Sequence, residues 1–404
     1  METTALYDIL NIETLGHVDH GKTSLTKAIT GIWADKHSES IKRNMTIKLG
    51  YADTTIRKCP KCNIYTTKNT CEACGVETEP VLKIAMLDAP GHETLMATAI
   101  AGASIIDAAI FVIAANEPCP MPQTKEHMMI IKLLGIKNVI IVQTKIDIVG
   151  RDAAIKHYNQ IKEFIKGSPI ENAPIIPVVA TLGINIDVLL EKIVELPRPK
   201  RDIDSDPIMY TIRSFDINKP GKKIESLSGG VLGGIILRGK FKVKDEIEIR
   251  PGINISIPGK HDSIYKPALT TIESISSGSE NLTEAYAGNM VGLSTNIDPS
   301  FVKADNMVGN LVGHVNRLPE VKKNIRIKYF SINRDDVPSK GFADGETLIL
   351  GIGTATSVGR ITSIKKSNLD IALTYPVCME ASAKIAILRN ISNRWKLVGY
   401  GIPA

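Results

Sequence analysis

Apolar and polar positions follow two different periods along the first half of this 404-residue chain. Short runs that are almost wholly apolar predict buried strands at 8–15, 82–87, 108–115, 138–143 and 175–179. Between these runs, apolar residues recur with a helical period and predict helices at 22–30, 93–105, 123–134, 152–166 and 185–195. Apolar strands that alternate with helices are typical of a mostly parallel sheet with helices on both faces.

The second half of the chain has another pattern. A polar, proline-rich stretch at 196–207 has no periodicity and predicts a linker. Beyond it the helical period is lost, and short strand-like runs are separated by Gly, Pro and Asn turns. This pattern favours antiparallel strands closed into barrels, because closure leaves no unpaired edge. A break near 318–320 predicts two such barrels, and the expected domains are 1–200, 206–319 and 320–404.

Composition narrows the class of protein. Hydrophobic residues make up 43% of the chain and charged residues 23%, which is ordinary for a soluble globular protein. No run of about 18 apolar residues indicates a membrane span, and the N-terminus lacks the features of a secretory signal. The net charge of +6 favours a polyanionic partner only weakly. We expect a cytoplasmic protein with no membrane partner.

A glycine-rich loop separates the first predicted strand from the first predicted helix. Residues 16–23 read GHVDHGKT and match the pattern G-x-x-x-x-G-K-[ST] in the strand–loop–helix context that this motif requires. Backbone N–H groups would face phosphates, the lysine would add charge, and the threonine hydroxyl would reach Mg²⁺. A chance glycine loop is the alternative. The predicted nucleotide-binding positions are Val18, Asp19, His20, Gly21, Lys22, Thr23 and Ser24.

A second motif, DAPGH at 88–92, follows the predicted strand 82–87. An acid at Asp88 can hold magnesium through water, and the Gly91 N–H can approach a γ-phosphate without a side chain in the way. A turn with an N-capping aspartate would use the same residues. The pairing with the glycine loop favours the nucleotide interpretation.

A third motif, TKID at 144–147, follows the predicted strand 138–143, where a base should lie. The carboxylate of Asp147 can accept two hydrogen bonds from guanine that adenine does not offer. The stem of Lys145 can lie along the face of the base. A solvated charged loop is the alternative for this motif alone, but the three motifs together predict a guanine-nucleotide site.

Four of the six cysteines crowd one short segment. They form two C-x-x-C hooks separated by eight residues, and the four are Cys59, Cys62, Cys71 and Cys74. Tetrahedral Zn²⁺ fits such a set, and loops this short bury no core of their own. A redox pair is the alternative, without a thioredoxin-like context to support it. The spacing predicts a structural zinc knuckle at 55–80.

The three nucleotide motifs, in this order and spacing, resemble those of the translational GTPases related to elongation factor Tu. Within that group, RNMTIKLGYAD at 43–53 closely resembles the switch 1 segment of the gamma subunit of eukaryotic and archaeal translation initiation factor 2. SFDINKPG at 214–221, RPG at 250–252 and WKLVGYG at 395–401 resemble the same family. The resemblance covers nearly the whole chain.

The resemblance implies an α/β P-loop GTPase domain with a zinc knuckle, followed by two antiparallel β-barrel domains, and the ligands GTP/GDP, Mg²⁺ and Zn²⁺. It implies that Thr46 completes magnesium coordination in the GTP state, together with Thr23 and Asp88. Asp19 would join a second magnesium ion. His92 would orient the attacking water, so the chain would be a GTPase that a partner protein stimulates.

Two positions depart from the family pattern. The family has Asn where Thr144 stands, and that amide tethers both the base and the phosphate loop. Threonine has one hydroxyl and cannot reproduce both contacts, so we expect weaker nucleotide retention. Val179 replaces a serine, but the base is read there mainly by the backbone N–H groups of Ala180 and Thr181, so guanine preference should persist.

The resemblance also implies partners. The ligand would be methionylated initiator tRNA, with Asn44 and Tyr51 of switch 1 near its pocket. The other partners would be the alpha and beta subunits of the factor, the small ribosomal subunit, and GTPase-activating and nucleotide-exchange factors. Two alternatives stay open from the sequence: an elongation- or selenocysteine-type tRNA carrier of the same fold, and an interaction scaffold that holds nucleotide but rarely hydrolyses it.

Overall fold

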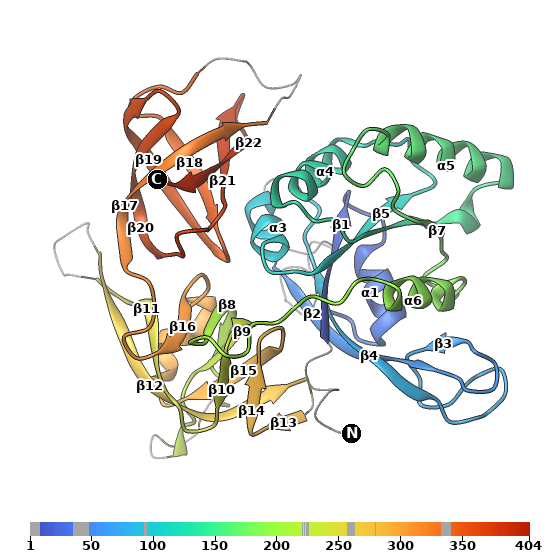
Figure 1. The fold of residues 1–404 in the computed structure, drawn as a ribbon, viewed down its shortest axis with the longest axis horizontal. Helices are drawn as coiled ribbons and strands as arrows, with labels where there is room; N and C mark the ends of the chain where they lie inside the picture. Colours follow the sequence, from blue (N-terminus) through green and yellow to red (C-terminus); the bar gives the residue numbers. More distant parts are fainter. Residues whose placement is uncertain are drawn as a thin grey trace. The chain divides into compact units, whose positions relative to one another are not determined.

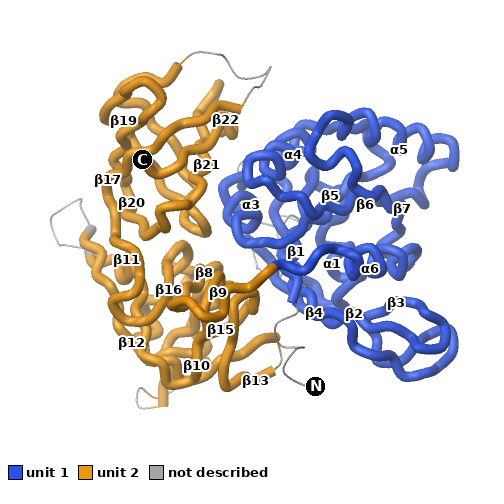
Figure 2. Tube along the Cα trace, in the orientation of Figure 1, with its two compact units in different colours: residues 1–199 blue, residues 200–404 orange. Residues whose placement is uncertain are grey.

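The computed structural model describes residues 9–34, 48–92, 95–219, 221, 223, 226–256, 263–278, 280–332 and 341–404. The chain divides into two compact units, residues 1–199 and 200–404, which Figure 2 colours blue and orange. Among the helices formed by the described residues, none combines the length and the apolar character needed to cross a membrane.

The elements of the first unit are, in chain order, β1 (Ile9–Gly16), α1 (Lys22–Thr30), β2 (Gly50–Lys58), β3 (Tyr65–Thr66), β4 (Glu79–Asp88), α3 (Met96–Ala103), β5 (Ala108–Ala114), α4 (Pro122–Leu134), β6 (Val139–Thr144), the 3₁₀ turn η2 (Ile146–Ile148), α5 (Arg151–Ile165), β7 (Ile175–Pro177) and α6 (Ile186–Val194).

The elements of the second unit are β8 (Ile208–Phe215), β9 (Val231–Arg238), β10 (Lys240–Lys242), β11 (Glu246–Ser256), β12 (Ser263–Ser277), β13 (Glu280–Leu282), β14 (Glu284–Tyr286), β15 (Met290–Thr295), α7 (Pro299–Val302), η4 (Lys303–Asp305), β16 (Leu311–His314), β17 (Val321–Ser331), β18 (Thr347–Ile352), β19 (Ala355–Lys365), β20 (Asn368–Cys378), β21 (Ile385–Ile391) and β22 (Arg394–Pro403).

A mixed sheet forms the middle of the first unit, with the strand order β3-β2-β4-β1-β5-β6-β7 (Figure 1). From β4 to β7 the neighbours are parallel, as the alternation of apolar strands and helices predicts. Helices α1 and α6 cover one face, and α3, α4 and α5 cover the other (Figure 1). Ile110 of β5 belongs to the core under α1 and α6, whereas its neighbour Phe111 contacts Phe164 of α5.

Strand β2 is the one long element of this sheet that the sequence analysis does not predict. It runs antiparallel to β4 near the edge of the sheet. Polar residues such as Asp53 and Thr55 alternate with buried Ala52 and Ile56, so the strand lacks the continuous apolar run of its buried neighbours. The predicted helix 93–105 is α3, although Glu93 and Thr94 lie outside the described residues.

Most of the described strands of the second unit close into two antiparallel barrels, and β10 and β14 form a separate two-stranded antiparallel sheet. The first ring runs β11-β16-β8-β9-β15-β12 and closes because β12 also pairs with β11, with β13 beside β12. The second runs β17-β20-β19-β18-β21-β22. Each ring encloses its own apolar cluster. The predicted fold class, a P-loop domain followed by two β-barrels, is therefore confirmed.

Candidate nucleotide site and candidate metal centre

Glycines allow the loop between β1 and α1 to form. Gly16 ends β1 with φ of 144°, and a Cβ atom there would lie 2.2 Å from the carbonyl oxygen of Val112 in β5. Gly21 precedes α1 with a left-handed φ of 87°. Because side chains disfavour both conditions, the two glycines of the motif are needed for the turn itself. Asp19 lies exposed between them with φ of 58°.

Lys22 folds back over this loop. Its ammonium group donates hydrogen bonds to the carbonyl oxygens of Gly16, at 3.1 Å, and His17, at 2.7 Å. The side chain is buried, and burial lowers the pKa of the amine to about 8 although the charges of Asp88 and Asp19 oppose this. A desolvated ammonium inside a loop of backbone amides fits a phosphate group, which would restore a partner to the charge.

Two oxygen ligands meet where β4 ends and α1 begins. Asp88 is fully buried and accepts hydrogen bonds from the hydroxyl groups of Thr23, at 2.5 Å, and Thr14, at 3.0 Å. A carboxylate and a hydroxyl oxygen are ligands that Mg²⁺ prefers. The residues present therefore fit a magnesium ion beside the loop.

The DAPGH turn packs directly on the phosphate loop. A Cβ atom on Gly91 would lie 2.5 Å from the Lys22 ammonium nitrogen and 2.9 Å from the backbone nitrogen of Val18. Only glycine allows this approach. His92 follows, half-buried, and its carbonyl oxygen accepts the N–H of Leu95 at 2.9 Å. The structure thus brings the turn and the loop together, as the motifs predict for a shared site.

Thr144, the last residue of β6, reaches the same loop. Its hydroxyl donates to the carbonyl oxygen of His20 at 2.7 Å. The threonine therefore supplies the contact to the phosphate loop, which is one of the two contacts expected of an asparagine. Lys145 follows in a left-handed conformation with φ of 58°, and Asp147 is exposed in the η2 turn.

The loop after β7 completes this edge of the sheet. Val179 and Ile184 form an isolated antiparallel bridge, which closes a short loop containing half-buried Ala180 and exposed Thr181. Since β1, β5, β6 and β7 are parallel neighbours, the segments that follow them emerge at one edge. The predicted phosphate and base segments therefore lie along the carboxyl ends of the strands.

Three side chains near the loop, two of them buried and one half-buried, escape the sequence analysis as functional groups. The amide of Gly16 donates to Nδ1 of His127 at 3.0 Å. Glu117 lies 3.2 Å from the ring of His20, which also contacts the Val112 carbonyl. Glu13 is fully buried in β1, and neither of its carboxyl oxygens has a hydrogen-bond partner among the described residues. Among these three side chains, only Glu13 is signalled by the local sequence, as a charged residue within an apolar strand.

The environment of the loop shifts the pKa values of His20 and Glu13. Burial lowers the pKa of His20 to about 4, although the Val112 carbonyl and Glu117 act in the opposite direction. Burial, followed by the charge of Asp88, raises the pKa of Glu13 well above its usual value of 4.5. Both groups are therefore held towards their neutral forms close to the loop.

The structure gives a partial account of the switch-like segment. Thr46 and Asn44 lie outside the described residues. Tyr51 lies in β2 opposite Leu87, is half-buried, and has the pKa of its hydroxyl raised by burial and by Asp53.

The four knuckle cysteines come together at one point. Their sulfur atoms all lie within 4.8 Å of one another, and those of Cys59 and Cys74 are 3.5 Å apart. Tetrahedral zinc with Zn–S bonds of about 2.3 Å would place sulfur atoms about 3.8 Å apart. The cluster therefore fits a zinc ion, and all four residues are free thiols rather than disulfides.

Both hooks of the knuckle use the same turn. Asn63 and Gly75 follow the second cysteine of each hook with left-handed φ values of 59° and 71°. Their N–H groups donate to the carbonyl oxygens of Cys59, at 2.9 Å, and Cys71, at 2.8 Å. Residues that tolerate positive φ stand at both equivalent positions, which explains this part of the spacing.

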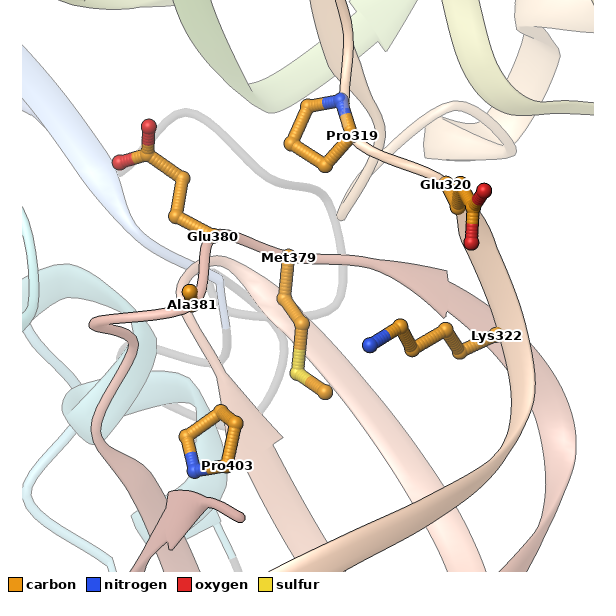
Figure 3. Close-up of a pocket in the computed structure, with 7 residues that line it drawn as sticks. All are labelled: Pro319, Glu320, Lys322, Met379, Glu380, Ala381 and Pro403. Carbon is orange, nitrogen blue, oxygen red and sulfur yellow. The ribbon is translucent and has the colours of Figure 1, made fainter.

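A hollow in the second unit has different chemistry. This cavity, of about 230 Å³, is lined by Pro319, Glu320, Lys322, Met379, Glu380, Ala381 and Pro403 (Figure 3). Lys322 points towards Met379 across it, and Glu380 is ion-paired with Arg238. The lining offers neither a glycine loop nor a pair of hard oxygen ligands, so the nucleotide chemistry lies in the first unit.

A P-loop domain whose predicted magnesium and base segments share one edge, followed by two β-barrels, is the architecture of a translational GTPase. Residues 7–199 match the family model described as the elongation factor Tu GTP binding domain. Residues 326–403 match that described as initiation factor eIF2 gamma, C terminal. The chain belongs to the translation initiation factor 2 subunit gamma family. As a member, it is a GTPase that uses GTP/GDP and Mg²⁺.

Curated relatives match along almost the whole chain. Translation initiation factor 2 subunit gamma of Methanocaldococcus jannaschii is 51% identical over 398 residues, covering 97% of this chain and 96% of that protein. The protein of that name from Pyrococcus horikoshii is 49% identical, covering 97% of each.

Solved structures support the fold. A bacterial selenocysteine-specific elongation factor, EF-Sec, has a TM-score of 0.74 at 25% identity, covering 98% of this chain and 58% of that one. Elongation factor SelB from Methanococcus maripaludis, in complex with the GTP analogue GppNHp, has a TM-score of 0.72 at 23% identity, covering 98% and 78%. The selenocysteine-type alternative is not favoured, because the initiation factor subunits are far more similar in sequence.

Proposed function

We propose that this chain is the GTP-binding subunit of a heterotrimeric translation initiation factor. In its GTP state it binds methionylated initiator tRNA and delivers it to the small ribosomal subunit, and GTP hydrolysis releases it. The observation that carries the proposal is the convergence of 16–23, 88–92, 144–147 and 180–181 at one edge of the sheet, in a chain of this family.

The phosphates of GTP would bind to the loop amides and to Lys22. Thr23 and Asp88 would hold magnesium, which when bound neutralises negative charge on the phosphate oxygens. Support comes from the 2.5 Å hydrogen bond that already joins these two side chains. Thr46 in the GTP state, and Asp19 at a second ion, are proposed from the family pattern.

Hydrolysis requires little covalent chemistry from the protein, so its residues act by position. His92 would orient the attacking water, because it follows the glycine that packs on the phosphate loop. Asp147 would recognise guanine, with Lys145 along the base and the amides of Ala180 and Thr181 beside it. GTPase-activating and nucleotide-exchange factors would set the rates of hydrolysis and of GDP release.

The remaining proposals concern partners and domains. The pocket for the methionylated tRNA end would include Asn44 and Tyr51, with barrels 206–319 and 320–404 supplying further surface for tRNA and for the alpha and beta subunits. The knuckle at 55–80 would hold structural zinc. The protein would act in the cytoplasm, where initiation takes place.

Filter binding tests the proposal directly. Methionylated initiator tRNA should be retained in the presence of Mg²⁺ and a non-hydrolysable GTP analogue, and retention should fall with GDP. Elongator methionyl-tRNA is the matched control and should bind more weakly. Equal retention of both tRNAs would favour a general carrier. Absence of saturable GTP uptake by the purified chain would overturn the proposal as a whole.

A further inference from the structure

We infer that His127 is a positioning residue for nucleotide binding: its imidazole holds the backbone amide of Gly16, and thereby fixes the phosphate loop in the shape that receives GTP or GDP. This inference rests on the proposed nucleotide site and deepens it. His127 lies on α4, outside the three nucleotide motifs, and acts through the loop rather than on the reacting atoms.

The contact is direct and buried. The N–H of Gly16 donates to Nδ1 of His127 at 3.0 Å, across 111 positions of sequence. The donor belongs to the first residue of the loop, and His127 has no exposed surface. The carbonyl group of the same Gly16 accepts a hydrogen bond from Lys22, so one peptide position links α4 to the lysine of the phosphate loop.

Hydrogen bonding fixes the chemical form of the ring. Nδ1 accepts a proton donor, so it carries no hydrogen, and the single proton of a neutral imidazole is on Nε2. Burial lowers the pKa of His127 to about 3, and the positive charge of Lys22 lowers it further in the same direction. The acceptor at Nδ1 is therefore present throughout the physiological pH range.

The lack of a described partner for Nε2 is evidence against a purely structural role for His127. Nε2 is buried and has no hydrogen-bond partner among the described residues. Thr124 and Gln123, one turn earlier on the same face of α4, also carry buried oxygen atoms without a described partner. A buried unpaired N–H destabilises a fold, and an apolar side chain of similar size would avoid that penalty. The hydrogen bond from Gly16 to Nδ1 accounts for a histidine at this position.

Two substitutions distinguish an effect on the positioning of the phosphate loop from an effect on the stability of the fold. His127→Asn keeps an acceptor, Oδ1, close to the place of Nδ1, but removes volume from the core. His127→Leu keeps apolar bulk and removes the acceptor. If the hydrogen bond positions the loop, release of fluorescent GDP from the Mg²⁺-loaded full chain should be roughly tenfold faster in His127→Leu, because the Gly16 amide is left unpaired. His127→Asn should remain within about threefold of the unmodified chain.

Thermal unfolding should show the opposite order. His127→Leu should be at least as stable as His127→Asn, because leucine fills the site and removes the unpaired Nε2–H, whereas asparagine leaves a cavity and buries an amide N–H group without a partner. Lys125→Ala, at an exposed position of the same helix, is the matched control and should leave GDP release unchanged.

The outcomes are distinguishable. If GDP release follows thermal stability, so that His127→Asn loses nucleotide faster than His127→Leu, the positioning role is overturned. It is also overturned if His127→Leu releases GDP at the rate of the unmodified chain. If the unmodified chain binds no guanine nucleotide, the proposed function fails instead, and that result is read before either variant is compared.

Discussion

The phosphate loop and the cysteine knuckle are both irregular segments of the first unit, and they are held in opposite ways. His127 and Thr144, from α4 and β6, bind the backbone of the phosphate loop, and Lys22 binds two of its carbonyl groups. The knuckle depends on two local turns and on four converging thiols. The fold can shape the first site in advance, whereas we expect the second to require a metal ion.

The largest expected effect is loss of the knuckle when zinc is removed. Structural zinc contributes on the order of 10 kcal/mol or more to such small modules. Chelation, or Cys59→Ala, should therefore expose 55–80 to proteolysis, with cleavage roughly a hundredfold faster or more. The barrels have separate cores and should stay intact. Limited proteolysis with mass spectrometry and metal analysis measures both effects.

Cys119→Ala serves as the control for the knuckle, because that cysteine lies outside the cluster. It should keep its metal and its resistance to proteolysis. An unchanged cleavage pattern after chelation would mean that local packing alone holds the knuckle, and the contrast with the phosphate loop would disappear.

Lys22→Ala should give the second largest effect. It should weaken ligand binding and leave the fold intact, whereas loss of zinc should unfold the knuckle. The ammonium can make charge-assisted hydrogen bonds to phosphate, and losing them should weaken GTP binding by roughly a hundredfold. The fold should persist, because the substitution removes a buried charge that burial already disfavours. Titration with GTP and Mg²⁺ measures the loss of binding, and thermal unfolding measures whether the fold persists. Binding within about tenfold of the unmodified chain would contradict the assigned role.

Glu13→Gln tests the strand that carries the phosphate loop. The pKa of Glu13 is raised above 4.5, so the folded chain keeps a proton that the unfolded chain releases. Its contribution to stability is greatest below pH 4.5 and is lost as pH rises through the raised pKa, by up to about 1.4 kcal/mol per pH unit. Glutamine cannot ionise and should remove this slope.

Thermal unfolding of both chains across pH 4 to 8 measures the difference. The glutamine variant should be the more stable at neutral pH, and the gap should narrow towards acid. A gap that does not change with pH would show that the carboxyl group finds a partner when it ionises.

The smallest expected effect belongs to Thr144. Its hydroxyl already holds His20, so Thr144→Asn should add only a contact to the base. One hydrogen bond of about 0.5–1.5 kcal/mol corresponds to GDP binding about 2–10 times tighter. Thr144→Val removes the hydroxyl and should loosen GDP by a similar factor. GDP affinity that does not improve in the asparagine variant would count against this reading of the site.

Local sequence pattern predicts most of the first unit, because continuous apolar runs identify buried parallel strands. The predicted strand 138–143 and helix 123–134 differ from β6 and α4 by a single residue at each shifted end. Strand β2 escapes this approach, because its polar residues face outwards near the edge of the sheet. The end of β7 also falls short of the predicted 175–179, since the chain turns there into the Val179–Ile184 bridge.

The candidate site also contains residues that the sequence predicts and residues that only the fold brings together. Its motif residues are recognisable, because glycine, lysine and acids stand at fixed spacing within one loop. His127 is not recognisable from spacing, because its partner lies 111 positions away and only the packing of α4 brings them together. The environment of Glu13 is equally invisible in sequence, since burial and the neighbouring Asp88 arise from the sheet.

The two carbonyl groups that hold the Lys22 ammonium also act as internal competitors for it. An anion that enters the loop has to displace both of them before it gains the full charge. A lone inorganic phosphate offers few further contacts to offset that exchange, whereas a polyphosphate chain also reaches the loop amides and a metal. We therefore expect the resting position of this one side chain to favour ligands with longer phosphate chains over a single phosphate.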